Sequence, residues 1–213
     1  MVPPSEDMSS RPRERSTDAG DGTRRVRADA RRNEDAVLDA AKVVFARLGV
    51  DAPVRDIALQ AGVGVGTLYR RFPKRADLVA AVFRREVDAC ALAAGELAAE
   101  RPPVDALGEW LVLYTRFIAT KRGLASALHS GDPAFETLPS YFRSRFEPAL
   151  EGLLDAACKA GDIGTGCTAY DLLRAVGNLS VATGDDSQAH IERMVRLLIH
   201  GLRYRAGRVD SDE

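Results

Sequence analysis

The chain has 213 residues, and its 30 Lys and Arg against 31 Asp and Glu give a formal net charge of −1. With 46% hydrophobic and 29% charged residues it can bury a core, which excludes a globally disordered chain. No apolar run approaches the roughly 20 residues of a membrane span. The cysteines, Cys90, Cys158 and Cys167, are odd in number and far apart, which excludes a disulfide scaffold and fits a reducing cytoplasm.

Charge is unevenly distributed along the chain. Residues 24–85 carry 14 basic and 7 acidic side chains, a net charge of +7, whereas residues 86–213 carry 13 basic and 19 acidic ones, a net charge of −6. A compact basic segment joined to a larger acidic one suggests that the first meets a polyanion. An ordinary fluctuation of charge along the chain is the alternative.

The first half of the sequence predicts a tail and three helices. Residues 1–23 are rich in Pro, Ser, Asp, Arg and Gly, lack the apolar segment of a secretory signal, and are expected to be disordered. Apolar residues then follow a helical spacing as far as Leu48, with Gly49 as the stop. Two short helices are expected over 54–61 and 67–72, separated by a glycine-containing turn.

The rest of the chain also predicts helices, and no stretch has the period-2 pattern of a strand. They are expected at about 75–99, 104–120, 122–129, 140–160, 168–182 and 188–205. The predicted class is therefore all-α, with about nine helices. We expect a three-helix head over 24–74, a helical-bundle body over 75–207 and a disordered C-terminal tail over 208–213.

The two short helices and their turn form a helix-turn-helix pattern inside the basic part of the chain. The segments VRDIA from Val54, AGV from Ala61, GTLY from Gly66 and FPKR from Phe72 resemble the N-terminal domain of the TetR/AcrR family of bacterial transcriptional regulators. The resemblance covers about residues 33–80. It implies a head that binds double-stranded operator DNA.

The same resemblance implies roles for individual residues. Thr67 and Tyr69 would bind phosphate oxygens through their hydroxyl groups, and Arg75 would do so at the start of the next helix, with Lys74 adding charge. Arg70 would reach a base edge. The residues expected to contact DNA are Arg24, Arg25, Arg27, Arg55, Val65, Gly66, Thr67, Tyr69, Arg70, Lys74 and Arg75.

Some positions depart from the family pattern or allow a second interpretation. The family commonly has Ser or Thr where this chain has Gly64, and often a polar residue where it has Val65, which can meet a thymine methyl group but cannot donate a hydrogen bond. Tyr69 is alternatively a core aromatic, and each N-terminal Arg is alternatively a solvated charge of the tail.

The acidic body is expected to dimerise. The last two predicted helices have broad apolar faces, and the resemblance implies that they form a four-helix bundle with a second copy; burial within the monomer is the alternative. The expected interface residues are Leu172, Leu173, Val176, Leu179, Ile191, Met194, Val195, Leu198 and Leu202.

The body is also expected to bind an unidentified small-molecule effector in a mostly apolar pocket between the helix over 75–99 and those over 104–160. The expected lining residues are Phe83, Val87, Trp110, Tyr114, Phe117, His129, Phe142, Arg145 and Asn178. For each aromatic residue, plain core packing is the alternative.

No enzyme class fits. The glycine-rich stretch from Gly62 to Gly66 has no preceding strand and no phosphate-loop Lys, and the three histidines lack metal-ligand spacing, so neither a metal nor a cofactor is expected. The sequence predicts a ligand-responsive, non-enzymatic repressor without a membrane partner, released from a palindromic operator by a small hydrophobic ligand. The alternative is a helical scaffold protein with non-specific DNA affinity.

Overall fold

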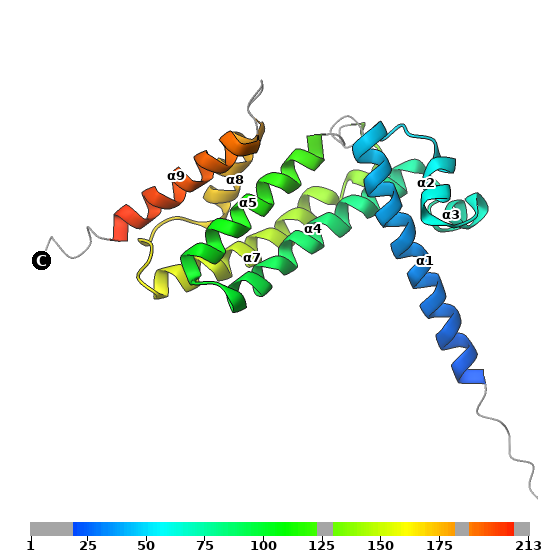
Figure 1. Ribbon diagram of the computed structural model, residues 1–213, viewed down its shortest axis with the longest axis horizontal. Coiled ribbons are helices and arrows are strands. Elements are labelled where there is room, and N and C mark those ends of the chain that lie inside the picture. The colour runs from blue at the N-terminus through cyan, green and yellow to red at the C-terminus, as the bar shows by residue number, and fades with distance from the viewer. Residues whose placement is uncertain (1–18, 123–129, 182–187, 207–213) are drawn as a thin grey trace, which may run out of the picture.

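The computed structural model describes residues 19–122, 130–181 and 188–206. Within these ranges the chain forms eight α-helices, one short 3₁₀ helix and no strand, which confirms the all-α prediction (Figure 1). Most of the helix expected over 122–129 lies outside the described residues. The elements are α1 (Ala19–Leu48), α2 (Val54–Ala61), α3 (Val65–Arg71), α4 (Arg75–Glu100), α5 (Pro103–Arg122), η1 (Pro133–Phe135), α7 (Leu138–Lys159), α8 (Ala169–Val181) and α9 (Gln188–Ala206).

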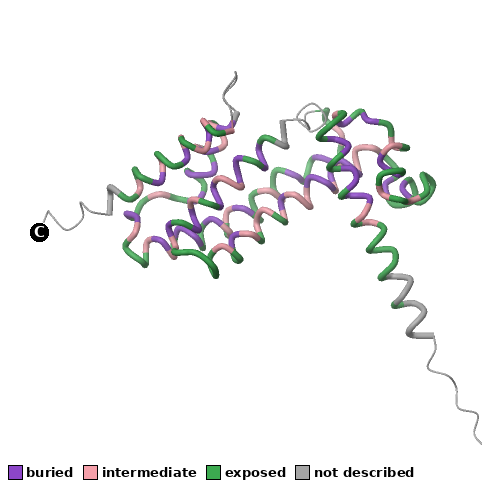
Figure 2. The backbone as a smooth tube through the Cα atoms, in the orientation of Figure 1, coloured by how far each residue is buried: buried purple, intermediate pink, exposed green. Residues whose placement is uncertain are grey.

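Helix α1 is longer than the sequence pattern indicates. It begins at Ala19, so the expected boundary of a disordered tail at residue 23 is corrected for residues 19–23. Among the described side chains of α1, Val37 is the first that is buried, so the apolar periodicity that indicates a helix lies in the second half of α1 (Figure 2). The first half of α1 projects away from the rest of the molecule, so no apolar face is needed there (Figure 1).

Helices α1 to α3 form the head, residues 19–74. Helix α2 packs against α1 through Ile57 and Ala58, which are both buried. The third helix contributes one fully buried side chain, Leu68, and Phe72 follows it into the same core. The head is thus held by a small apolar centre beneath α2 and α3.

Helices α4 to α9 form the body, residues 75–206, and its core is aromatic. Helix α4 packs lengthwise against α5 and α7, and α8 and α9 cover α5 on the other side (Figure 1). Phe146 of α7 is fully buried and meets Trp110, Tyr114 and Phe117 of α5 edge to face. Edge-to-face contacts of this kind align the positive ring edge with a negative ring face.

Polar contacts connect head and body along α4. The Arg75 guanidinium, at the first residue of α4, donates to the carbonyl oxygens of Val50 and Ala52, the latter at 2.7 Å. Further along α4, Arg85 donates to the carbonyl oxygen of Asp35 at 2.8 Å and pairs with Asp39 at 3.0 Å. The first three turns of α4 are therefore bonded to the helix and loop that precede α2.

Candidate functional site

The turn between α2 and α3 is set by a glycine in the left-handed region. Gly62 has a φ of +68°, and the next residue, Val63, donates its backbone N–H to the carbonyl of Ala58 at 3.0 Å. This is the hydrogen bond of a Schellman-type helix end, which favours glycine because a Cβ is strained there. Gly64 then starts α3 without a side-chain cap. The chain reverses over three residues and places α3 across the end of α2.

Replacing Gly62 by alanine is expected to lower the free energy of unfolding by about 1–2 kcal/mol, because alanine is strained at positive φ. A Cβ at this position would meet no atom within 4 Å, so the loss has a backbone origin. Gly66→Ala is the matched control: Gly66 is helical and equally open, so alanine should stabilise by about 0.5–1 kcal/mol. Urea denaturation of both variants measures the difference, and equal effects would contradict the turn assignment.

Helix α3 has one buried side and one open side. Leu68 is 2% exposed, whereas Val65 is 41% and Tyr69 49% exposed. Thr67 and Arg70 are exposed as well, and the guanidinium of Arg70 makes no hydrogen bond to the described residues. The residues expected to contact DNA on this helix therefore lie together on its solvent side. The exposure of Tyr69 argues against its alternative role as a core aromatic.

The other expected DNA contacts are in different environments. Arg55 is exposed beside Asp56, with 3.6 Å between the charged atoms, and Lys74 is exposed at the start of α4. Arg75 is half-buried, and its guanidinium donates hydrogen bonds to the backbone carbonyls of Val50 and Ala52. It therefore positions α4 as well as adding charge near the head surface. Arg24 is exposed on the projecting half of α1. The side chains of Arg25 and Arg27 lie outside the described residues.

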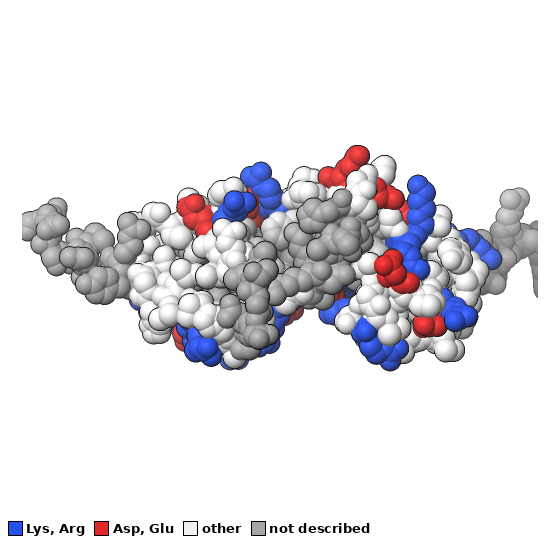
Figure 3. Space-filling view, turned by 90° about the horizontal axis from the view of Figure 1, so that it is seen from above, with Lys and Arg blue, Asp and Glu red and all other residues white. Residues whose placement is uncertain are grey.

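Ion pairs neutralise part of the positive charge of the head. Arg71 of α3 donates to Glu34 of α1 at 2.7 Å, and this pairing raises the pKa of the guanidinium further. Lys42 of α1 pairs with Glu86 of α4 at 2.8 Å. On the face seen in Figure 3 acidic side chains accordingly lie among the basic ones of the head. The basic excess of the sequence is therefore not one continuous patch on that face.

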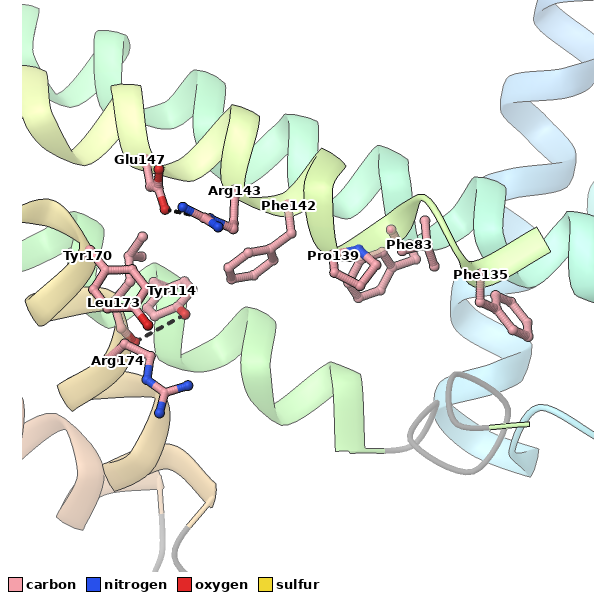
Figure 4. A pocket seen from close by; sticks show the side chains of 11 residues that line it. Phe83, Tyr114, Phe135, Pro139, Phe142, Arg143, Glu147, Tyr170, Leu173 and Arg174 are labelled. Atoms are coloured by element: carbon pink, nitrogen blue, oxygen red, sulfur yellow. Dashed lines mark hydrogen bonds and ion pairs between the residues drawn. The ribbon is translucent and has the colours of Figure 1, made fainter. Parts of the chain in front are cut away.

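The body contains a cavity of about 470 Å³ between α4, η1, α5, α7 and α8. Phe83, Tyr114 and Phe142, three of the expected lining residues, all border it (Figure 4). The Tyr114 hydroxyl donates to the carbonyl oxygen of Leu173 at 3.4 Å, and burial raises its pKa, so it stays protonated at neutral pH. The volume fits a drug-sized molecule.

The remaining expected pocket residues do not line this cavity. Val87, Trp110 and Phe117 are buried behind its wall, and the Trp110 indole donates to the carbonyl of Cys90 at 2.8 Å. These three are core residues. For Trp110 and Phe117 this is the alternative left open by the sequence, and for Val87 it corrects the expected place in the pocket.

Two polar residues expected in the pocket lie elsewhere, and one cannot be placed. Arg145 pairs with Asp88 of α4 at 2.6 Å, beside the Tyr141 hydroxyl that donates to the same carboxylate. Asn178 is exposed on α8. Neither lines the cavity, because the first is held by α4 and the second faces solvent. His129 lies outside the described residues.

Sequence reasoning missed the polar part of the cavity lining. Arg143 and Glu147 come from α7, one turn apart, and Tyr170 and Arg174 come from α8, also one turn apart. The i, i+4 spacing within each pair was the available signal. Nothing in the sequence tells which pairs of this kind face a cavity.

The apolar faces of α8 and α9 divide into a buried and an open part. Five of the expected interface residues are buried within the monomer: Leu172, Leu173, Val176, Ile191 and Val195. They attach the two helices to the body and are unavailable to a partner, which corrects their expected place in an interface. The open part, which we call the α8–α9 face, has an almost wholly apolar lining. It consists of Ala175, Leu179, Met194, Leu197, Leu198, Gly201 and Leu202, and the same groove is also lined by Cys167, Asp171 and the buried Leu172.

The described residues contain no cluster of three or more potential metal ligands. Among these same residues, no helix is both long and apolar enough to cross a membrane.

Two family models match the chain. Residues 37–82 match the model of bacterial regulatory proteins of the tetR family, and residues 102–204 match the C-terminal domain of SbtR-like transcriptional regulators. The first match covers residues 37–74 of the head and the start of α4, and the second covers the body from α5 to α9.

Solved structures and curated proteins agree with these matches. A TetR transcriptional regulator from Streptomyces coelicolor is 36% identical with a TM-score of 0.69, over 80% of this chain and 98% of that one. A TetR regulatory protein from Mycobacterium vanbaalenii is 34% identical with a TM-score of 0.65, over 84% and 99%. A gamma-butyrolactone receptor shares the fold at 20% identity and a TM-score of 0.58, over 84% and 94%.

An HTH-type transcriptional regulator of Staphylococcus aureus is 36% identical over 64 residues, which are 30% of this chain and 35% of that protein. The chain thus spans about a third of the length of the curated relatives it matches. The two family models and the two solved regulators more than 30% identical indicate the same family, and the chain covers nearly the whole length of both regulators. The chain belongs to the TetR family of helix-turn-helix transcriptional regulators.

Proposed function

We propose that the protein is a homodimeric repressor that binds a palindromic operator through α3 and leaves it when a small, largely apolar ligand occupies the body. The observation that carries this proposal is the course of α4. The helix begins at Arg75, bonded to the head, and Phe83, eight residues further on, borders the cavity. At about 1.5 Å per residue, one rigid element of roughly 12 Å separates the two places.

The DNA contacts divide into two kinds. Thr67 and Tyr69 are exposed, and their hydroxyl groups suit phosphate oxygens, which fix the register of α3 without reading sequence. Arg70 is exposed on the same helix and suits the O6 and N7 acceptors of guanine, while Val65 suits a thymine methyl group.

Dimerisation through the α8–α9 face supplies the second α3 helix, which binds the second half-site of the operator. Two recognition helices must lie roughly 34–36 Å apart to enter successive major grooves, so one head alone is insufficient. The α8–α9 face includes Leu197, which is 60% exposed in the monomer. A second copy would bury it.

Release by a ligand is a population shift between two spacings of the heads. The ligand must favour the released spacing by about 5.5 kcal/mol to reverse a 99:1 distribution. Burial of a few hundred Å² of apolar ligand surface, at roughly 25 cal/mol per Å², supplies free energy of that size. A TetR-fold gamma-butyrolactone receptor sets a precedent for a small molecule in this architecture.

Selection of duplexes from a random-sequence pool by the full chain tests the proposal although the operator is unidentified. We expect a palindromic consensus that binds with at least about 10³-fold preference over a scrambled duplex in fluorescence anisotropy at about 150 mM salt. Failure to enrich any consensus, with equal and steeply salt-dependent binding to all duplexes, would instead support a scaffold protein with only phosphate contacts.

Arg70→Ala is expected to weaken binding to the selected operator about 10- to 100-fold and to relax the preference at one base pair of each half-site. Arg71→Ala is the matched control, because it removes the same charge from the next residue of α3, where the guanidinium is occupied by Glu34. The control should retain the base preference. Equal loss of specificity in both variants, measured by anisotropy on single-base-pair operator variants, would contradict the role of Arg70.

A further inference from the structure

The cavity of the body differs in character between its two ends. At one end the lining is apolar, with Phe83, Phe135 and Pro139 from α4, η1 and α7 (Figure 4). At the other end the lining includes Arg143 of α7 and Arg174 of α8 (Figure 4). A ligand that matches both ends is therefore amphipathic along its length.

The charges at the polar end do not cancel. Arg143 donates to Glu147 at 2.9 Å and lies 6.0 Å from the ring centroid of Tyr170, so its charge is neutralised and its position fixed by neighbours. Arg174 is exposed and has neither a hydrogen bond nor an ion pair among the described residues. The two arginines and the one glutamate leave a net charge of +1 at this end.

The remaining polar side-chain groups of the described lining are the hydroxyl groups of Tyr114 and Tyr170. The Tyr114 hydroxyl is occupied by the carbonyl of Leu173 and remains neutral. Glu147, whose carboxylate is bonded to Arg143, is the one acidic side chain of the described lining. The free guanidinium is planar and has paired donors, a geometry that matches a carboxylate.

We propose that the effector is an elongated apolar molecule ending in a carboxylate, with the carboxylate at Arg174 and the apolar body between Phe83 and Phe142. This inference rests on the proposed function, in that it names the chemical class of the effector. Such a site selects against neutral apolar molecules of the same shape. They bury the same apolar surface but leave the Arg174 guanidinium without an anion.

The probes are 4-butylbenzoate and its neutral counterpart 4-butylbenzamide, titrated into the full chain by isothermal calorimetry. We expect the carboxylate to bind about tenfold more tightly than the amide, because solvent exposure of Arg174 reduces a gain that would be larger in a closed site. Arg174→Gln should abolish the preference by weakening only the carboxylate, and Arg174→Lys should retain part of it. Arg196→Gln removes an exposed arginine of α9 outside the cavity and serves as the control.

Each outcome decides a distinct point. Equal affinity for both probes, unaffected by Arg174→Gln, overturns the carboxylate assignment and leaves a ligand-binding body intact. Binding of neither probe overturns the assignment as well. Selective binding of the carboxylate that leaves the anisotropy of the protein–operator complex unchanged supports the assignment but contradicts release by the ligand, and so separates this inference from the proposed function.

Discussion

Phe146→Ala is expected to lower the free energy of unfolding by about 3–5 kcal/mol, the usual loss when a fully buried phenylalanine is truncated. Phe146 is 0% exposed, and its ring centroid lies 5.7 Å from that of Trp110, 5.4 Å from Tyr114 and 4.6 Å from Phe142. The truncation removes apolar burial, leaves a void and abolishes several edge-to-face contacts together.

The loss can be measured by urea denaturation followed by circular dichroism at one fixed protein concentration, since a dimer's stability depends on concentration. Leu92→Ala serves as the control, because Leu92 is 65% exposed on α4 and should change stability by less than about 0.5 kcal/mol. A loss below about 1 kcal/mol for Phe146→Ala would mean that the aromatic cluster is not the centre of the body's core.

Leu197→Glu is expected to convert the protein to a monomer and to weaken operator binding at least about 100-fold. Two heads joined in one dimer bind an operator more tightly than a single head by a factor of this order. Leu197 lies in the α8–α9 face, where association would bury a carboxylate from each copy against apolar side chains with no cation provided. The same substitution leaves the monomer intact, because the side chain is already in solvent.

Leu92→Glu is the matched control for the dimer, since it introduces the same charge at an equally exposed leucine outside the α8–α9 face. Sedimentation velocity and anisotropy on the selected operator read out the two effects. A Leu197→Glu variant that remains dimeric, or a control that dissociates to the same extent, would place the dimer interface elsewhere.

The sequence is most informative where local signals agree. Helix α2 occupies the predicted range Val54–Ala61, and α4 begins at the predicted Arg75, because glycine and proline mark those boundaries through the backbone itself. Helix α3 begins at Val65, two residues before the predicted start. Gly64 supplies no side-chain cap by which the start could be recognised.

Tertiary packing decides what the sequence could not. Leu173 and Leu172 are neighbours with the same chemistry and are both buried, yet one borders the cavity and the other lies beneath the groove of the α8–α9 face. Periodicity identifies both as apolar but does not assign their sides when a helix packs on two partners. The contact between Arg143 and the Tyr170 ring depends likewise on how α7 packs against α8. The residue spacing within each helix does not determine that packing.

Helix α3 is attached to the head by a single fully buried side chain, Leu68. Val65, Thr67, Tyr69 and Arg70 are exposed, so substitutions at these positions change what the helix recognises with little effect on how firmly the head folds. Duplicated copies of such a gene can therefore acquire new target sites by drift at residues 65, 67, 69 and 70, without a stabilising mutation elsewhere. The readout surface and the scaffold are free to evolve at different rates.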